Sequence, residues 1–151
     1  MLNLDYIYEL SKVTEQMSNC VSRKVVAIIF KDDDILEIAT NGVPYKLANC
    51  KDSGECKRRA LGFKSGEGMD KCIAEHAESN AISRCAKYGK STNGAFIFIN
   101  TPPCASCVKK IFEAGIVKIY YSGDYPSKIK NEGLETANKL GIEVINYKKE
   151  D

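Results

Sequence analysis

The chain has a single histidine and seven cysteines, and their spacing suggests metal chemistry. His76 lies in the stretch "KCIAEHAESNAI", two residues before Glu78. Cys104 and Cys107 lie in "TPPCASC", where a spacing of three residues places both sulfurs on one face of a helix. Two thiolates and one imidazole would give zinc three ligands and leave the fourth tetrahedral position open to water. This is the pattern of a catalytic zinc site.

Each half of this pattern has an ordinary explanation when it is taken alone. A CxxC pair could be a redox dithiol, and a His-Ala-Glu sequence on a helix is more often part of the surface. The combination of H-x-E with P-C-x-x-C, however, is the signature of zinc deaminases, in which the glutamate is not a ligand. His76 and Glu78 would lie roughly 200° apart around a helix, so we expect His76 to bind zinc and Glu78 to carry protons. Attack at C4 of a cytosine ring would then yield uracil.

The composition bounds the class of protein. The 151 residues are enough for one domain with a core, and 44% hydrophobic with 28% charged residues is typical of a globular protein. A net charge of +2 does not indicate a dedicated nucleic-acid-binding protein. The longest apolar run, "VVAIIF", is too short to span a membrane, and "MLNLDYIYEL" has no signal-peptide pattern. Without an export signal, so many cysteines favour metal binding over disulfides, and we expect a cytoplasmic protein, in the host cytoplasm if the source is viral.

The hydrophobic pattern predicts an α/β protein in which helices and strands alternate. A turn at Asp32–Asp34 separates the first two strands, and residues 41–70 are too irregular and glycine-rich for one regular element. Gly115 and Gly141 are expected to end two of the helices. The expected helices span residues 3–18, 72–87, 101–114 and 127–140, and the expected strands lie within 24–40, 94–100, 116–121 and 142–147. This alternation predicts parallel strand pairs in the second half of the chain.

With these motifs the chain resembles the cytidine deaminase superfamily, and within it the deoxycytidylate (dCMP) deaminases of phages, bacteria and archaea. The resemblance runs from about Cys20 to Tyr125 and includes "SNCVSRKVVAIIFKDDDIL", "NGVP", "GECKRRALGFKSGEGMDKC", "HAESNAI", "TPPCASC" and "AGIVKIYY". The cysteine-bearing insertion at about 41–71 is what points to dCMP deaminases, because a minimal tRNA adenosine deaminase would not be expected to carry it. The family implies a three-layer αβα fold with a central mixed five-stranded sheet, in a single zinc-dependent deaminase domain over residues 1–151.

Three positions depart from the usual motifs of this family. Val26 replaces the glycine of "KVGAV", Thr40 replaces the aromatic residue of "YNG", and Asn49 replaces a histidine often found before the loop cysteine. These departures bear on the substrate and on nucleotide regulation more than on the class of reaction.

The resemblance also implies a nucleotide pocket. In it Asn41 would hydrogen-bond the base or sugar, the Ala77 backbone N–H would contact the base edge, and Tyr125 would pack beside the ring. Arg23 and Lys24 are the candidates for binding a 5′-phosphate, with the "KRR" cluster of the insertion as another. Simpler explanations stay open: Asn-Gly is also a turn dipeptide, Tyr125 could merely cover the end of a strand, and lysines and arginines usually lie on the solvated surface.

A second, structural zinc is implied for many members of the family. Four thiolates would close a tetrahedral site and fix the irregular segment. The candidates are Cys20, Cys50, Cys56 and Cys72, although free cysteines are often small buried hydrophobic residues, as we expect for Cys85. The family further implies a homo-oligomer, often a hexamer, that dCTP activates and dTTP inhibits, with room for Mg²⁺ bound with the regulatory nucleotide.

The function that follows is the zinc-dependent hydrolytic deamination of dCMP to dUMP and ammonia, which would supply dUMP for thymidylate synthesis. The main alternative is a deaminase of another cytosine or adenine substrate, such as a nucleoside, dCTP or single-stranded nucleic acid. Single-stranded nucleic acid is disfavoured because the chain has no tryptophan and no strong excess of basic residues. A non-enzymatic zinc-binding module would account for the cysteines but not for Glu78 beside an open three-ligand site. We therefore expect a small nucleotide as the partner, with no membrane and no nucleic acid.

Overall fold

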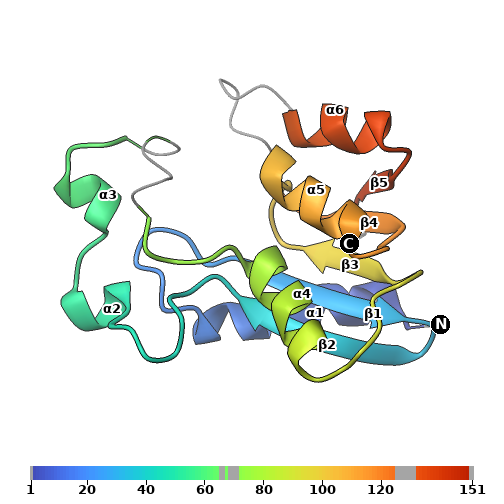
Figure 1. Ribbon diagram of the computed structural model, residues 1–151, viewed down its shortest axis with the longest axis horizontal. Coiled ribbons are helices and arrows are strands. Elements are labelled where there is room, and N and C mark those ends of the chain that lie inside the picture. Colours follow the sequence, from blue (N-terminus) through green and yellow to red (C-terminus); the bar gives the residue numbers. More distant parts are fainter. Residues whose placement is uncertain (1, 65–66, 68–71, 125–131, 150–151) are drawn as a thin grey trace.

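The computed structural model of the chain describes residues 2–64, 67, 72–124 and 132–149, and it has a five-stranded sheet at its centre (Figure 1). The strands lie in the order β2-β1-β3-β4-β5. Their bounds are β1 Val26–Lys31, β2 Asp34–Thr40, β3 Phe96–Ile99, β4 Lys118–Tyr121 and β5 Glu143–Asn146. β1 is antiparallel to both β2 and β3, whereas β3, β4 and β5 are parallel to one another. The predicted mixed sheet, with parallel pairs in its second half, is confirmed.

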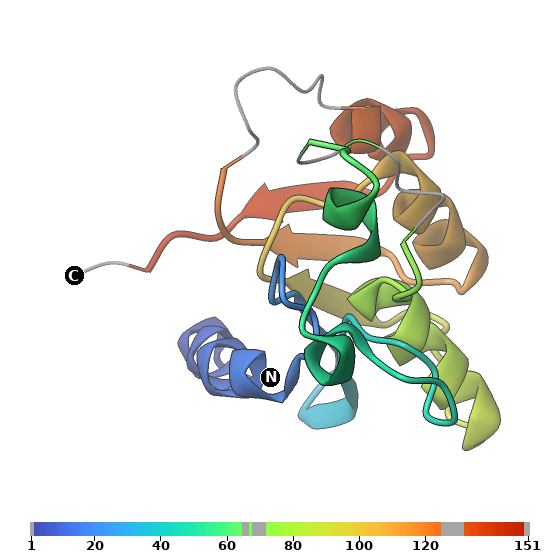
Figure 2. The same cartoon turned by 90° about the vertical axis from the view of Figure 1, so that its left-hand side faces the viewer.

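Helices cover both faces of this sheet. Figure 2 shows α1 on one side of the strands and α4, α5 and α6 on the other, which gives the predicted three-layer αβα arrangement. The bounds of these helices are α1 Leu4–Thr14, α4 Ala77–Lys87, α5 Ala105–Glu113 and α6 Glu132–Lys139, and a short 3₁₀ turn, η1 Glu15–Met17, follows α1. Within the described part of the chain, no helix is both long and apolar enough to cross a membrane.

Two hydrophobic clusters, one on each side of the sheet, explain why β1 is apolar along almost its whole length. Successive side chains of a strand point to opposite faces, so a strand covered on both faces must be apolar at every position. The cluster on the α1 side consists of Ile7, Val26, Ile28, Phe30, Phe98 and Tyr120. The cluster on the other side includes Ala27, Ile29, Ala77, Ala81, Cys85, Ile97 and Val108. Cys85 is fully buried there, as the sequence predicts.

The structure corrects two predicted boundaries and leaves a third untested. The helix predicted from Cys72 begins only at Ala77, because Gly42 and Glu75 form a two-hydrogen-bond antiparallel bridge, with N···O distances of 3.1 and 2.9 Å. The helix predicted from "TPPC" begins at Ala105, after both prolines. Residues 127–131 of the last predicted helix lie outside the described residues, and the described helix starts at Glu132.

The irregular segment after β2 contains two single-turn helices. They are α2 Cys50–Ser53 and α3 Lys57–Ala60. Asn49 caps α2, because its side chain accepts a hydrogen bond from the Asp52 N–H at 2.9 Å and Asp52 reaches back to the Asn49 N–H. The position where the family often has a histidine is therefore a helix cap in this chain.

Candidate active site

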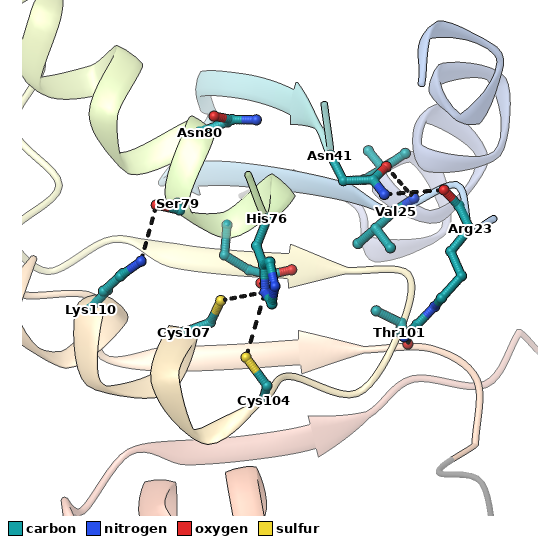
Figure 3. Close-up of polar contacts among 12 residues, drawn as sticks. Arg23, Val25, Asn41, His76, Ser79, Asn80, Thr101, Cys104, Cys107 and Lys110 are labelled. Atoms are coloured by element: carbon teal, nitrogen blue, oxygen red, sulfur yellow. Dashed lines mark hydrogen bonds and ion pairs between the residues drawn. The ribbon is translucent and has the colours of Figure 1, made fainter. Parts of the chain in front are cut away.

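The three candidate zinc ligands lie at the starts of two neighbouring helices, α4 and α5 (Figure 3). His76 is the residue that precedes α4 and has an extended backbone, with φ −66° and ψ 148°. Cys104 holds the equivalent position before α5, and Cys107 lies in the first turn of that helix. The expected 200° separation of His76 and Glu78 around one helix is therefore wrong, since His76 is not helical. Their different directions come instead from the bend of the chain as it enters α4.

Prolines and a close helix contact position the cysteine ligands. Pro102 and Pro103 end the chain segment that leaves β3. The residues before them, Thr101 and Pro102, are disfavoured in a helix, so α5 cannot include them, and it begins at Ala105. Gly133 of α6 packs directly on the Pro103 carbonyl group, where any larger residue would collide. Cys104 is thus held between the end of β3 and the start of α6.

The donor atoms match the dimensions of a zinc site. The His76 Nδ1 atom lies 3.2 Å from the Cys107 Sγ atom and 3.6 Å from the Cys104 Sγ atom. Zinc–sulfur and zinc–nitrogen bonds of about 2.3 and 2.0–2.1 Å at a tetrahedral angle place sulfur and nitrogen roughly 3.6 Å apart. Within the described residues, these three side chains form the one group of three whose ligand atoms all lie within 4.8 Å of one another. The site therefore fits a zinc ion with one open position.

The thiols of this site have strongly displaced pKa values. The pKa of Cys104 is lowered to about 4, chiefly because the Cys107 thiol donates a hydrogen bond to its thiolate, and also because the His76 ring and the Cys107 N–H stabilise that charge. The pKa of Cys107 is raised, mainly because its proton is held by the Cys104 thiolate. The contact with Cys104 also raises the pKa of His76. A coordinated dication favours both thiolates, because coordinating thiols lose their protons.

Glu78 lies beside the three candidate ligands but is not a member of their group. Its Oε2 atom is 3.9 Å from His76 Nδ1, and its side chain is 4% exposed. Burial is the main reason that the pKa of the Glu78 carboxyl is raised above its usual value. A raised pKa lets a carboxyl hold a proton more readily than an exposed glutamate does, which suits a group that must both accept and donate one.

A cavity of about 100 Å³ opens in front of these residues. Its lining includes the ligands His76 and Cys104 together with Ala77, Glu78, Cys20, Cys72, Arg23, Asn41, Thr101 and Arg58. Of the predicted substrate-binding residues, the structure thus brings Arg23, Asn41 and Ala77 to the cavity. Lys24 is exposed and does not line it. Tyr125 lies outside the described residues.

The Asn41 side chain fastens the segment before β1 to the end of β2. Its Oδ1 atom accepts a hydrogen bond from the Ser18 hydroxyl at 2.6 Å. The same oxygen accepts from the Val25 N–H at 3.0 Å, and the Nδ2 atom donates to the Arg23 carbonyl at 3.1 Å (Figure 3). The Asn80 side chain of α4 donates to the Thr40 carbonyl at 3.0 Å. Both side-chain amides hold this wall of the cavity in place. Asn41 therefore does more than form the Asn-Gly turn that the sequence alone could explain.

The four other candidate cysteines gather on the insertion side of the cavity. Cys50 and Cys56 are buried, and Cys20 and Cys72 are half-buried. The pKa of Cys50 is raised by its burial and then by the charges of Cys20, Cys72 and Cys56, so the other three thiols lie within electrostatic range of Cys50. Among the described residues they contain no group of three with ligand atoms as close as those around His76.

One lining residue, Arg58, stands out only in the folded chain. In the sequence it is the middle of a basic triplet, and nothing distinguishes it from Lys57 and Arg59. In the structure Arg58 is 6% exposed, whereas both neighbours are exposed and neither lines the cavity. Thr101, the first residue of "TPPCASC", is a second lining residue to which the sequence assigned no role.

Comparison with known proteins agrees with this site. The profile of the family described as "Cytidine and deoxycytidylate deaminase zinc-binding region" matches residues 2–123. The deoxycytidylate deaminase of Schizosaccharomyces pombe is 29% identical over 145 residues, which cover 94% of this chain and 43% of that protein. That of Mycobacterium phage D29 is 30% identical over 122 residues, covering 78% of this chain and 91% of the phage protein. The chain thus spans less than half of the length of its fungal relatives but nearly all of the phage enzyme.

A solved structure shows the same architecture. The dCMP deaminase of cyanophage S-TIM5, crystallised in complex with dCMP and dUMP, superposes with a TM-score of 0.78 at 29% identity, over 97% of this chain and all of the other. This agreement extends to the five-stranded sheet and its flanking helices. With a family profile that matches 2–123 and includes the His76, Cys104 and Cys107 group, the chain belongs to the cytidine and deoxycytidylate deaminase family.

Proposed function

We propose that the protein catalyses the hydrolytic deamination of dCMP to dUMP and ammonia, which would supply dUMP for thymidylate synthesis. The observation that carries this proposal is the buried Glu78 carboxyl beside a three-ligand zinc group, at the wall of a cavity. The choice of dCMP is supported by relatives from yeasts and phages that are named deoxycytidylate deaminases, and by the similar cyanophage enzyme crystallised with dCMP and dUMP.

The chemistry is divided between the metal and Glu78. Zinc held by His76, Cys104 and Cys107 would supply a water whose pKa is lowered to about 7. Glu78 would accept the first proton of this water and deliver it to the ring nitrogen next to C4, while the oxygen bonds to C4 as a hydroxyl. Glu78 would then take the proton of that C4 hydroxyl and transfer it to the amino group, which leaves as ammonia as the C4–N bond breaks. The new C4–O bond becomes the carbonyl of uracil, so a single buried carboxyl acts as both base and acid.

The cavity walls suggest how the nucleotide is oriented. Ala77 is the first residue of α4, where backbone N–H groups have no partner within the helix and can bind a base edge. Asn41 still has a second Nδ2 hydrogen available for the base or sugar. Arg23 donates to the Thr101 hydroxyl at 2.9 Å and keeps other donors for a phosphate, whereas Lys24 lies away from the cavity. Contact with Tyr125 stays a prediction.

A Glu78→Gln substitution tests this function. The amide has nearly the same shape but cannot exchange protons, so ammonia release from dCMP should fall about 10²- to 10⁴-fold while zinc content is unchanged. Glu113→Gln, at an exposed position of α5, is the matched control and should keep full activity. Wild-type activity in Glu78→Gln would exclude the proposed mechanism. Assaying the wild type with deoxycytidine, dCTP, adenosine and a short cytosine-containing single strand would show whether one of these is preferred over dCMP.

We also propose a second zinc bound by Cys20, Cys50, Cys56 and Cys72. The support is that Cys20, Cys72 and Cys56 all contribute to raising the pKa of the Cys50 thiol, so these three lie near Cys50. Metal analysis should then find two zinc ions per chain, with one lost in Cys56→Ser and both kept in a Cys85→Ala control. A single zinc that disappears in Cys104→Ala would reject the second site.

The hexamer, the dCTP and dTTP regulation with Mg²⁺, and the cytoplasmic location stay predictions.

A further inference from the structure

The Arg58 side chain is buried with unused hydrogen-bonding capacity. It is 6% exposed, and its Nη1 atom donates to the Glu67 carbonyl at 3.1 Å. Its Nε atom is buried and has no hydrogen-bond partner among the described residues. No carboxylate of those residues forms an ion pair with it. Burying an arginine is costly unless its charge and its donors are satisfied, so this arrangement calls for an acceptor.

Arg58 lies in the wall of the same cavity as the candidate catalytic residues. Arg58 lines it together with Arg23, and the carboxylates that line it, Glu75 and Glu78, both flank His76 in the sequence. The cavity therefore offers a proton carrier beside the zinc ligands and two guanidinium groups from other parts of the chain. Because Arg58 is buried, its interaction with an anion is screened by solvent much less than that of exposed Arg23.

A purely structural role does not account for Arg58. Its charge does contribute to lowering the pKa of Cys56, but the backbone N–H of Arg59 is the main cause, and the exposed Arg59 side chain contributes as well. The hydrogen bond to the Glu67 carbonyl uses one of the five N–H donors of the group. Neither contact uses Nε.

We propose that Arg58 binds the 5′-phosphate of the nucleotide and thereby makes the enzyme select a nucleotide over a nucleoside. This inference rests on the proposed dCMP deaminase function and assigns its phosphate recognition to a residue of the insertion. The planar guanidinium has five N–H donors, and the ones that the Glu67 carbonyl does not engage can bind phosphate oxygens in a bidentate geometry that lysine cannot reproduce. Arg23, in the segment before β1, supplies a second, weaker cationic contact.

The test compares dCMP with deoxycytidine, which is the same substrate without the phosphate. In Arg58→Gln we expect kcat/KM for dCMP to fall about 10- to 100-fold, the range for losing a hydrogen-bonded charged group. The same ratio for deoxycytidine should change less than about twofold. Arg59→Gln is the matched control, because it removes the same charge from the same short helix and also acts on Cys56. Zinc content and thermal unfolding are measured for each variant.

The outcomes separate this inference from the function on which it rests. If the wild type releases ammonia from neither compound, the proposed function fails and the inference fails with it. If the wild type deaminates deoxycytidine as well as dCMP, or if Arg58→Gln lowers both reactions equally, the enzyme is a deaminase but Arg58 does not read the phosphate. A loss confined to dCTP would equally overturn the inference. Should Arg58→Gln not fold, Arg58→Lys decides, because it keeps the charge and should raise KM for dCMP alone.

Discussion

A single added methyl group on α6 should disrupt the zinc site from outside it. Gly133 packs against the Pro103 carbonyl group, and a Cβ atom built on it would lie 2.9 Å from the Pro103 carbonyl carbon and 3.3 Å from the Cys104 carbonyl carbon. Favourable contacts between carbon atoms are about 3.5–4.0 Å, so Gly133→Ala requires α6 and the proline segment to separate by at least about 0.6 Å, and by more because the Pro103 carbonyl oxygen lies closer still. The glycine is helical, so no backbone strain accounts for its presence.

The required displacement is large on the scale of a metal site. Zinc–ligand distances are held to within about 0.2 Å, and Cys104 directly follows the displaced proline. Overpacking of this kind costs about 1–3 kcal/mol of the free energy of unfolding. Helix propensity alone predicts the opposite sign, since alanine is favoured over glycine in a helix by about 1 kcal/mol. The two arguments therefore make opposite predictions for one substitution.

Measurements of zinc affinity and thermal stability decide between these two predictions for Gly133→Ala. In Gly133→Ala we expect zinc, titrated against a chromophoric chelator, to bind at least about tenfold more weakly, with a lower unfolding temperature. Gly42→Ala is the control, because its added Cβ would meet nothing within 4 Å and its φ is not positive. Wild-type zinc affinity together with an unchanged or raised unfolding temperature in Gly133→Ala would refute the reasoning.

Two further predictions concern the scaffold around the site. Asn100→Ala should lower the free energy of unfolding by about 1–3 kcal/mol in urea titrations, because the Asn100 side chain accepts from the Val26 N–H at 2.8 Å and donates to the Lys24 carbonyl at 2.9 Å; a change below about 0.5 kcal/mol would contradict this. Cys85→Ser should cost about 1–3 kcal/mol, since it buries a hydroxyl in the apolar cluster, but zinc stoichiometry should stay unchanged. Loss of a zinc ion from this variant would instead make Cys85 a ligand.

The residue types and spacing around His76 and in "TPPCASC" were enough to predict a zinc group and a layered α/β fold. Residue type limits which side chains can bind zinc, and two cysteines three residues apart can reach one ion from a helix start. The helix boundaries are harder to predict from the sequence. The pattern extended the helix of Glu78 back to Cys72, because periodicity cannot register a backbone bridge between Gly42 and Glu75, residues far apart in the sequence.

What the sequence determined by itself is the chemistry: one histidine, paired cysteines and a glutamate whose spacing is typical of a zinc deaminase. What only the tertiary structure decided is which side chains have an environment that gives them a function. Arg58 differs from Arg59 by its burial and its place in the cavity wall, and Gly133 matters because α6 packs on Pro103. Burial and close packing depend on segments brought together from distant parts of the chain, and neither leaves a pattern in the local sequence that surrounds these residues.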